Sequence, residues 1–141
     1  MKIQVAIDCA DPHRLAAFYA AAFGYEVERH RRSSEVCLSK DIVTHDDLVE
    51  VDGRDAFATA AACSDPEGAL PRLLFQRVPE GKAVKNRVHL DFQMGGEAAR
   101  DHAVVRLLSI GATRLWDGQQ GPVHKWVTMG DPEGNELCVS D

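Results

Sequence analysis

The chain has 141 residues, of which 45% are hydrophobic and 27% are charged. This length and balance are typical of one globular domain and argue against disordered or fibrous proteins. The formal net charge of −6 argues against a nucleic-acid partner, because binding to phosphates needs clustered Lys and Arg. The most basic run, Arg29-His30-Arg31-Arg32, is interpreted as a solvated strand end.

The first residues and the cysteines bear on the cellular compartment. MKIQVAIDCADP contains no long apolar run, so we predict neither a secretory signal nor a membrane partner, and we expect a cytoplasmic protein. The four cysteines are widely spaced and form no CxxC pair. In a reducing compartment this pattern predicts free thiols rather than disulfides.

The first elements are a strand, a helix and a second strand. Residues 3–9 alternate between apolar and polar side chains, which predicts a half-buried strand. Asp11 and Pro12 are typical of a helix start, and Gly24 of a helix end. We therefore predict a helix over about 12–23, followed by a strand in YEVERHR. The apolar stripe of the helix contains Leu15, Phe18, Tyr19 and Phe23.

The same order returns in the second half. RVHLDFQ, residues 87–93, alternates as a strand with His89, Asp91 and Gln93 on its polar side. EAARDHAVVRLLSI, residues 97–110, predicts a helix that ends before Gly111. We assign its apolar face to Ala98, Val105, Leu108 and related positions.

Each half then ends in a hairpin around the same turn, DPEG, at residues 65–68 and 131–134. Asp-Pro favours turn initiation, and Gly supplies a positive φ. Asp65 lies 41 positions after Gly24, whereas Asp131 lies only 20 after Gly111, so the first half carries about 21 extra residues. We place this insert at about 33–56, with short helical or loop character.

Both halves therefore have the order strand, helix, strand, strand, strand. One helix covers only one face of a four-stranded sheet, so two such units are expected to enclose a cavity with their other faces. We predict an α+β fold of two tandem βαβββ modules forming a curved sheet around a shared cavity, in one domain over 1–141. Module 1 spans about 1–80 with the insert, and module 2 spans about 85–141.

Three segments carry a resemblance to a known family: IQVAIDCADPHRLAAFYAAAFGYEV, RVHLDFQ and DPEGNELCV. In their order and spacing they resemble the vicinal-oxygen-chelate superfamily, the glyoxalase, bleomycin-resistance and extradiol-dioxygenase group, and within it the glyoxalase-like domain subgroup. The resemblance covers nearly the whole chain apart from the insert. It implies the fold and a homodimer. It does not choose a reaction, because this fold hosts many activities.

The resemblance also implies where a metal would lie. Metal-dependent members take ligands from the first and last strand of each half, and these positions fall on Gln4, Gln76, His89 and Cys138, with Leu74 as the alternative to Gln76. This quartet has no carboxylate, whereas Mg²⁺, Mn²⁺ and Fe²⁺ prefer anionic oxygen. We therefore expect no cofactor and no strong divalent metal site; a weak site for Zn²⁺ or another divalent ion, using His89 and Cys138, is the alternative.

His89, Asp91 and Glu136 are the candidate catalytic residues. A carboxylate beside His89 either forms an acid–base pair with the imidazole or only fixes its tautomer. Glu136 shares the face of Cys138, where it either replaces the missing acid or lies exposed at the rim. Cys138 is alternatively a small core hydrophobe. Trp116 and Trp126 either line a site for a flat organic ligand or pack a strand edge.

The preferred interpretation is a protein that binds a small organic molecule in a cavity lined by Gln4, Gln76, His89, Cys138 and Trp126, without a strong metal site. One alternative is a metal-dependent lyase, isomerase or dioxygenase of the same superfamily. The other is a drug-sequestering protein of the bleomycin-resistance type, for which the net charge of −6 suits cationic drugs. Whether the protein is an enzyme is left open.

Overall fold

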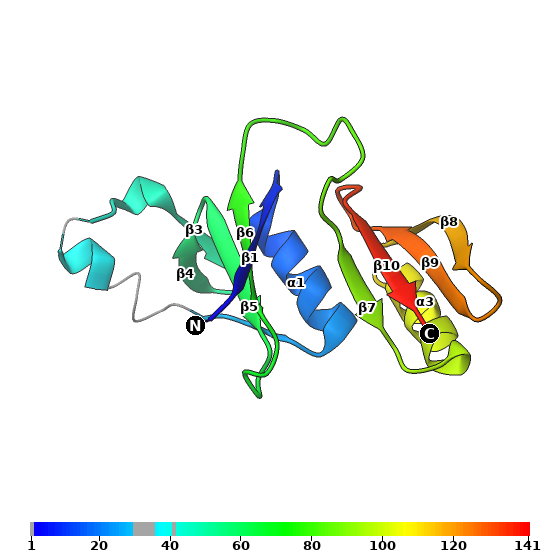
Figure 1. Ribbon diagram of the computed structural model, residues 1–141. Helices are drawn as coiled ribbons and strands as arrows, with labels where there is room; N and C mark the ends of the chain where they lie inside the picture. The colour runs from blue at the N-terminus through cyan, green and yellow to red at the C-terminus, as the bar shows by residue number, and fades with distance from the viewer. Residues whose placement is uncertain (1, 30–35, 41) are drawn as a thin grey trace. The chain divides into compact units, whose positions relative to one another are not determined.

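The computed structural model describes residues 2–29, 36–40 and 42–141. The chain divides into two compact units, Met1–Glu80 and Gly81–Asp141 (Figure 1). Residues 30–32 of the basic run lie outside the described residues, as do residues 33–35 and 41 of the insert. Within the described part of the chain, every helix is too short or too polar to cross a membrane.

The first unit is a four-stranded sheet with one helix. Its strands pair in the order β1-β6-β5-β2, where β1 and β6 are parallel and the other pairs are antiparallel. The helix, α1, follows β1 in the chain (Figure 1). The bounds are β1 Gln4–Cys9, α1 Pro12–Phe23, β2 Glu26–Val27, β5 Ala60–Ser64 and β6 Arg72–Arg77.

Helix α1 begins and ends where the sequence predicts. The Asp11 carboxylate accepts a hydrogen bond from the backbone N–H of Arg14 at 3.0 Å, and Pro12 occupies the first turn, where no N–H is needed. Gly24 ends the helix with φ of 73°, a left-handed conformation. Tyr19 is buried against Phe75 of β6, with ring centroids 5.3 Å apart. The apolar stripe therefore packs the helix onto the sheet.

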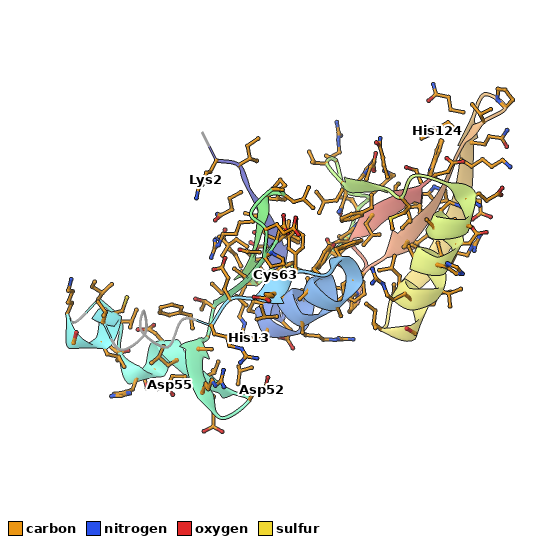
Figure 2. All side chains as sticks on the ribbon, turned by 90° about the horizontal axis from the view of Figure 1, so that it is seen from below. Lys2, His13, Asp52, Asp55, Cys63 and His124 are labelled. Atoms are coloured by element: carbon orange, nitrogen blue, oxygen red, sulfur yellow. The ribbon has the colours of Figure 1, made fainter. Side chains whose placement is uncertain are left out.

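The insert contains a hairpin that the sequence analysis did not predict. A short 3-10 helix, His45–Asp47, leads into β3, Leu48–Val51, which pairs antiparallel with β4, Arg54–Phe57. Asp52 and Gly53 form the turn with φ of 52° and 72°, and Figure 2 labels Asp52 there. Asp-Gly is a favoured two-residue hairpin turn, so this dipeptide was the signal that could have indicated the hairpin.

The second unit repeats the topology of the first. Its strand order is β7-β10-β9-β8, with β7 parallel to β10 and the other neighbours antiparallel. The α+β fold built from two four-stranded sheets is thus confirmed, whereas a cavity shared by the two units stays a prediction. The bounds are β7 Leu90–Gln93, α3 Glu97–Ser109, β8 Thr113–Gln120, β9 His124–Gly130 and β10 Glu136–Ser140.

The predicted apolar face of α3 is wrong. Ala98, Val105 and Leu108 are exposed, and the buried stripe consists instead of Arg100, Ala103, Val104 and Leu107. Apolar residues occupy both sides of this helix in AVVRLL, so periodicity allows two stripes, and packing on the sheet selects one. Arg100 is tolerated in the buried stripe because its guanidinium pairs with Asp101 at 2.8 Å and Glu97 at 3.1 Å.

The two DPEG turns have the same geometry. In the second, the Asp131 carboxylate accepts hydrogen bonds from the backbone N–H groups of Glu133 and Asn135 at 2.8 and 2.9 Å. In the first, Asp65 accepts from Glu67 in the same way at 3.1 Å. The closing glycines both have positive φ. The repeat predicted from these four residues is therefore present as an equivalent turn in each unit.

The corrected face of α3 leads to a stability prediction. Leu107→Ala removes a side chain that is 1% exposed, so it should lower the free energy of unfolding by about 2–5 kcal/mol. Leu108→Ala, at a neighbouring position that is 45% exposed, should lower it by about 0.5 kcal/mol or less. Urea unfolding followed by circular dichroism measures both. Equal losses for the two variants would contradict the assignment of the buried stripe.

Candidate functional site

The site lies on the face of the second sheet opposite α3. Successive side chains of a strand point to opposite faces, so Leu137 and Val139 of β10 are fully buried toward the helix side, whereas Cys138 points to the other. On that open face the structure has a cavity of about 380 Å³, lined by residues of the second unit alone. It brings together the second-half candidates His89, Asp91, Glu136, Cys138, Trp116 and Trp126.

Cross-strand pairing orders the lining into two rows. One row runs Asp91, Cys138, Thr128, Trp116 across β7, β10, β9 and β8, and the next runs Gln93, Ser140, Trp126, Gly118. The middle of the cavity has a floor of small side chains, with polar groups along β7 and indole rings toward β8. Three strand spacings separate the edge strands, which is about 14 Å at the backbone.

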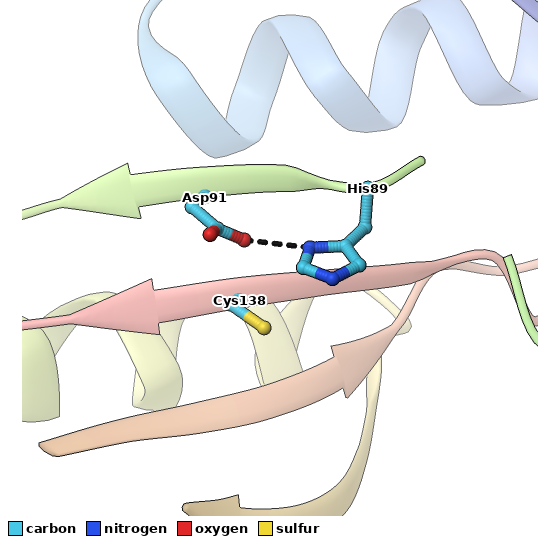
Figure 3. A group of neighbouring side chains, drawn as sticks. All are labelled: His89, Asp91 and Cys138. Atoms are coloured by element: carbon cyan, nitrogen blue, oxygen red, sulfur yellow. Dashed lines mark hydrogen bonds and ion pairs between the residues drawn. The ribbon is translucent and has the colours of Figure 1, made fainter. Parts of the chain in front are cut away.

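His89 and Asp91 form a hydrogen-bonded pair at the β7 side (Figure 3). His89 Nδ1 lies 2.7 Å from Asp91 Oδ1. A carboxylate accepts, so Nδ1 carries the proton that it donates, and in the neutral ring Nε2 remains available to a ligand. The His89 side chain is 33% exposed, which leaves it accessible from the cavity. The pair can therefore orient an imidazole that accepts a proton or binds a ligand at Nε2.

Cys138 is held as a thiol in the cavity floor. Its Sγ lies 3.5 Å from Thr128 Oγ1. Burial raises the pKa of the Cys138 thiol; the hydrogen bond with Thr128 opposes this in part, and the negative charge of Asp91 adds to it. These contacts do not activate Cys138 as a nucleophile, since they disfavour the thiolate.

Glu136 is buried, so the alternative that places it exposed at the rim is wrong. Its carboxylate accepts a hydrogen bond from the backbone N–H of Asn86 at 2.9 Å and forms an ion pair with Lys82 Nζ at 3.0 Å. Burial by itself raises the pKa of Glu136, but these two contacts, together with a hydrogen bond from its own backbone, outweigh burial, so the net effect lowers the pKa. Its charge is therefore already compensated, and it does not stand free as a base.

The first-unit candidates lie on the exposed face of their own sheet. Gln4 Oε1 accepts a hydrogen bond from the guanidinium of Arg72, and Gln76 is exposed on β6. Ala62 and Thr128 lie at the same number of residues before their DPEG turns. Ala62 pairs with Leu74, and Thr128 pairs with Cys138, so Leu74 is the equivalent of Cys138 in the first unit. Gln76 corresponds in the same way to Ser140. That Gln4 and Gln76 share a cavity with His89 and Cys138 stays a prediction.

Several lining residues were missed by the sequence analysis. Thr128 and Ser140 lie on the face of Cys138, and the alternation in KWVTMG and NELCVS was a signal that could have found them. His124, Gln120 and Lys85 also line the cavity. His124 continues the alternation of Trp126 and Thr128 on β9, and Gln120 that of Trp116 on β8, so the same signal could have found them. Lys85 has no such signal, because it lies in a loop before β7.

His89, Asp91 and Cys138 offer a set of metal-ligand atoms. One such atom from each residue lies within 4.8 Å of the others. The predicted quartet had no carboxylate, and Asp91 supplies one that motif positions alone did not indicate. One imidazole, one carboxylate and one thiol do not fit an ion that prefers oxygen, such as Mg²⁺ or Mn²⁺, but they fit Zn²⁺. A zinc ion held there would act as a Lewis acid.

A family model described as a glyoxalase-like domain matches residues 4–140. No curated protein matches the chain. Among solved structures, the chain is similar to a glyoxalase/bleomycin resistance protein/dioxygenase family enzyme from Burkholderia phytofirmans PsJN. The identity is 16%, 97% of this chain and 94% of that chain are covered, and the TM-score is 0.65.

Two further structures show the same fold. The lactoylglutathione lyase from Agrobacterium tumefaciens is 15% identical over 99% of this chain and 92% of that chain, with a TM-score of 0.58. A fosfomycin resistance protein from Listeria monocytogenes, a mutant in complex with Mn(II) and a dihydroxypropylphosphonic acid, is 10% identical over 96% and 85%, with a TM-score of 0.59. At these identities the likeness concerns the fold alone.

The His89–Asp91 contact predicts a defined tautomer. In the wild-type protein, nitrogen NMR of the imidazole should show a protonated Nδ1, because Asp91 accepts its proton. Asp91→Ala should remove this preference and shift the ring toward the tautomer protonated at Nε2. Gln93→Ala, two residues further along the same face, is the matched control and should leave the signals unchanged. An unprotonated Nδ1 in the neutral wild-type ring would contradict the contact.

Proposed function

The chain belongs to the glyoxalase-like domain family of the vicinal-oxygen-chelate superfamily, and we propose from this premise that it binds a small organic molecule on its second sheet. The binding site is the cavity on the open face of that sheet, without a firmly held Mg²⁺ or Mn²⁺ ion. One observation carries the proposal: the cavity of about 380 Å³ combines two indole rings with polar side chains that include the oriented imidazole of His89. Small-molecule sites have this size and combine aromatic walls with polar groups that fix the orientation of the ligand.

The charges of the lining support the proposal that the site holds no Mg²⁺ or Mn²⁺ ion firmly. A hard divalent ion needs carboxylates that are free to coordinate. Glu136 is engaged by Lys82 and Asn86, and Asp91 is engaged by His89. The position where the superfamily resemblance places an acid carries Cys138, whose pKa is raised. The site therefore suits recognition of an organic molecule better than polarisation of a substrate by Mn²⁺.

A metal-dependent lyase, isomerase or dioxygenase is the second candidate. The close grouping of His89, Asp91 and Cys138 favours it, since their ligand atoms lie within 4.8 Å of one another. In that function His89, Asp91 and Cys138 would hold Zn²⁺, which would supply a Lewis acid, and Asp91 would also accept the Nδ1 proton of His89. Residues of the first unit would belong to such a site only if the two units share a cavity.

Drug sequestration is a third function of the same class of proteins, and it needs no catalytic group. The indole rings of the cavity and the net charge of −6 favour it for cationic, aromatic drugs. Expression of the chain in bacteria challenged with a drug panel separates this function from the others. Protection that survives His89→Ala would support sequestration, because binding by aromatic walls does not require that imidazole.

Ligand binding itself is tested with a fragment library on ¹⁵N-labelled protein. Fragments that bind should shift the amide signals of Asp91, Cys138, Thr128 and Trp116, which form one row of the cavity. Cys138→Phe fills the floor and should weaken this binding at least about tenfold, which is about 1.4 kcal/mol. Leu108→Phe on the exposed side of α3 is the control. Shifts confined to other surfaces would contradict the proposal.

Metal binding is tested by calorimetry on protein freed of ions. Mg²⁺ and Mn²⁺ should bind with dissociation constants of about 1 mM or weaker, because the site offers them too few free oxygen ligands. Zn²⁺ should bind more tightly than either ion and lose that advantage in Cys138→Ser. If Mn²⁺ binds tightly and stoichiometrically and His89→Ala abolishes this binding, the proposal of a site without a firmly held Mn²⁺ ion is overturned. That result would support a metal-dependent lyase, isomerase or dioxygenase.

A further inference from the structure

Trp126 lies directly over Gly118, its cross-strand neighbour on β8. An added Cβ at Gly118 would stand only 2.1 Å from Cε2 of the indole and 2.4 Å from Nε1. Real Cβ atoms do not approach so closely, so the ring occupies the space that any other side chain at position 118 would fill. Glycine at this position therefore lets the indole of Trp126 lie across the strand.

Two further rings complete an aromatic corner around Trp126. Trp116 precedes Gly118 by two residues on the same face of β8 and is 45% exposed. The ring centroids of His124 and Trp126 lie 5.6 Å apart, and the two ring planes are tilted by 40°; Figure 2 labels His124. Trp116, Trp126 and His124 all line the cavity. We call these three residues the aromatic corner.

The far end of the same cavity has different chemistry. The His89–Asp91 pair lies on the β7 side, and the Asp91 side chain is 55% exposed. Between the two ends, Cys138 and Ser140 form a floor of small side chains. Across the strands, the lining therefore changes from the three aromatic rings with Gln120 at the β8 end to the His89–Asp91 pair at the β7 end.

We propose that the cavity selects an elongated small molecule that has a planar aromatic ring at one end and a hydrogen-bonding tail at the other. The ring stacks in the aromatic corner, on the indole that Gly118 allows to lie over β8, and the tail reaches His89 and Asp91. This inference rests on the proposed function and narrows it to a ligand class. Gly118 is a positioning residue in this arrangement, because it acts through Trp126.

Aromatic stacking distinguishes this ligand class from an equally large saturated molecule. Offset or edge-to-face pairs of rings gain attraction beyond the burial of area, by a factor of about two to ten in affinity per pair. A saturated ring of the same size buries similar area without that gain. The ratio of the two affinities therefore reports stacking rather than general hydrophobicity.

The experiment uses three probes titrated into the full-length protein and followed by NMR. Phenylbutylamine carries an aromatic ring and an ammonium, cyclohexylbutylamine replaces only the ring, and phenylbutyrate replaces only the charge of the tail. Phenylbutylamine should bind at least about threefold more tightly than cyclohexylbutylamine, because the tails are the same and only the aromatic ring stacks. Phenylbutyrate reports the effect of the charge of the tail. Binding should shift the indole N–H signals of Trp116 and Trp126.

Variants test the role of the aromatic corner. Gly118→Ala should displace the Trp126 ring and abolish the preference for phenylbutylamine over cyclohexylbutylamine, because both probes lose contact area but only the aromatic one also loses stacking. Gly81→Ala is the matched control, since no atom lies within 4 Å of a Cβ added there and its φ is not positive. Trp126→Leu tests the same point if Gly118→Ala does not fold.

The outcomes separate this inference from the proposed function. Equal affinities for the aromatic and saturated probes, or a preference that survives Gly118→Ala and Trp126→Leu, would overturn the inference. If library fragments bind in the cavity and neither aromatic probe does, the inference also fails while small-molecule binding stands. An aromatic preference lost in both variants and kept in Gly81→Ala supports it.

Discussion

The parallel pairing of the first and last strand of each unit is the constraint on which the rest depends. In the second unit this pairing sets Asp91 of β7 directly beside Cys138 of β10, although they are far apart in the sequence. Because β10 also pairs with β9, the same register sets Thr128 beside Cys138. The cavity is a consequence of this register, since a slip of β10 by one residue would turn Cys138 to the helix face, away from Asp91 and Thr128.

One helix per sheet explains why a site is present at all. Helix α3 buries one face of the second sheet through Val104 and Leu107, and the other face keeps polar and aromatic side chains. On β10, Leu137 and Val139 pack toward the helix, whereas Cys138 lies in the floor of the cavity on the other face. One face of the sheet therefore packs against α3 and stabilises the unit, and the other face carries the residues that are available for binding.

Compensation of charge decides which polar groups remain available to a ligand. Glu136 is buried, and a buried carboxylate is stable only with partners, which Lys82 and the backbone of Asn86 provide. The pair of His89 and Asp91 is more exposed and keeps a free ring nitrogen. The chemistry of the cavity is therefore centred on an oriented imidazole, beside a protonated thiol.

Local signals in the sequence determined helix α1, the two DPEG turns and the order of the elements outside the insert, because caps, glycines and alternation act over a few residues. They also placed His89 and Asp91 on one polar side. Only the tertiary structure decided that Leu107 rather than Leu108 is buried, that Glu136 has partners, and that the second unit forms a cavity. Those outcomes depend on which faces pack and which strands pair, and these contacts join residues distant in sequence.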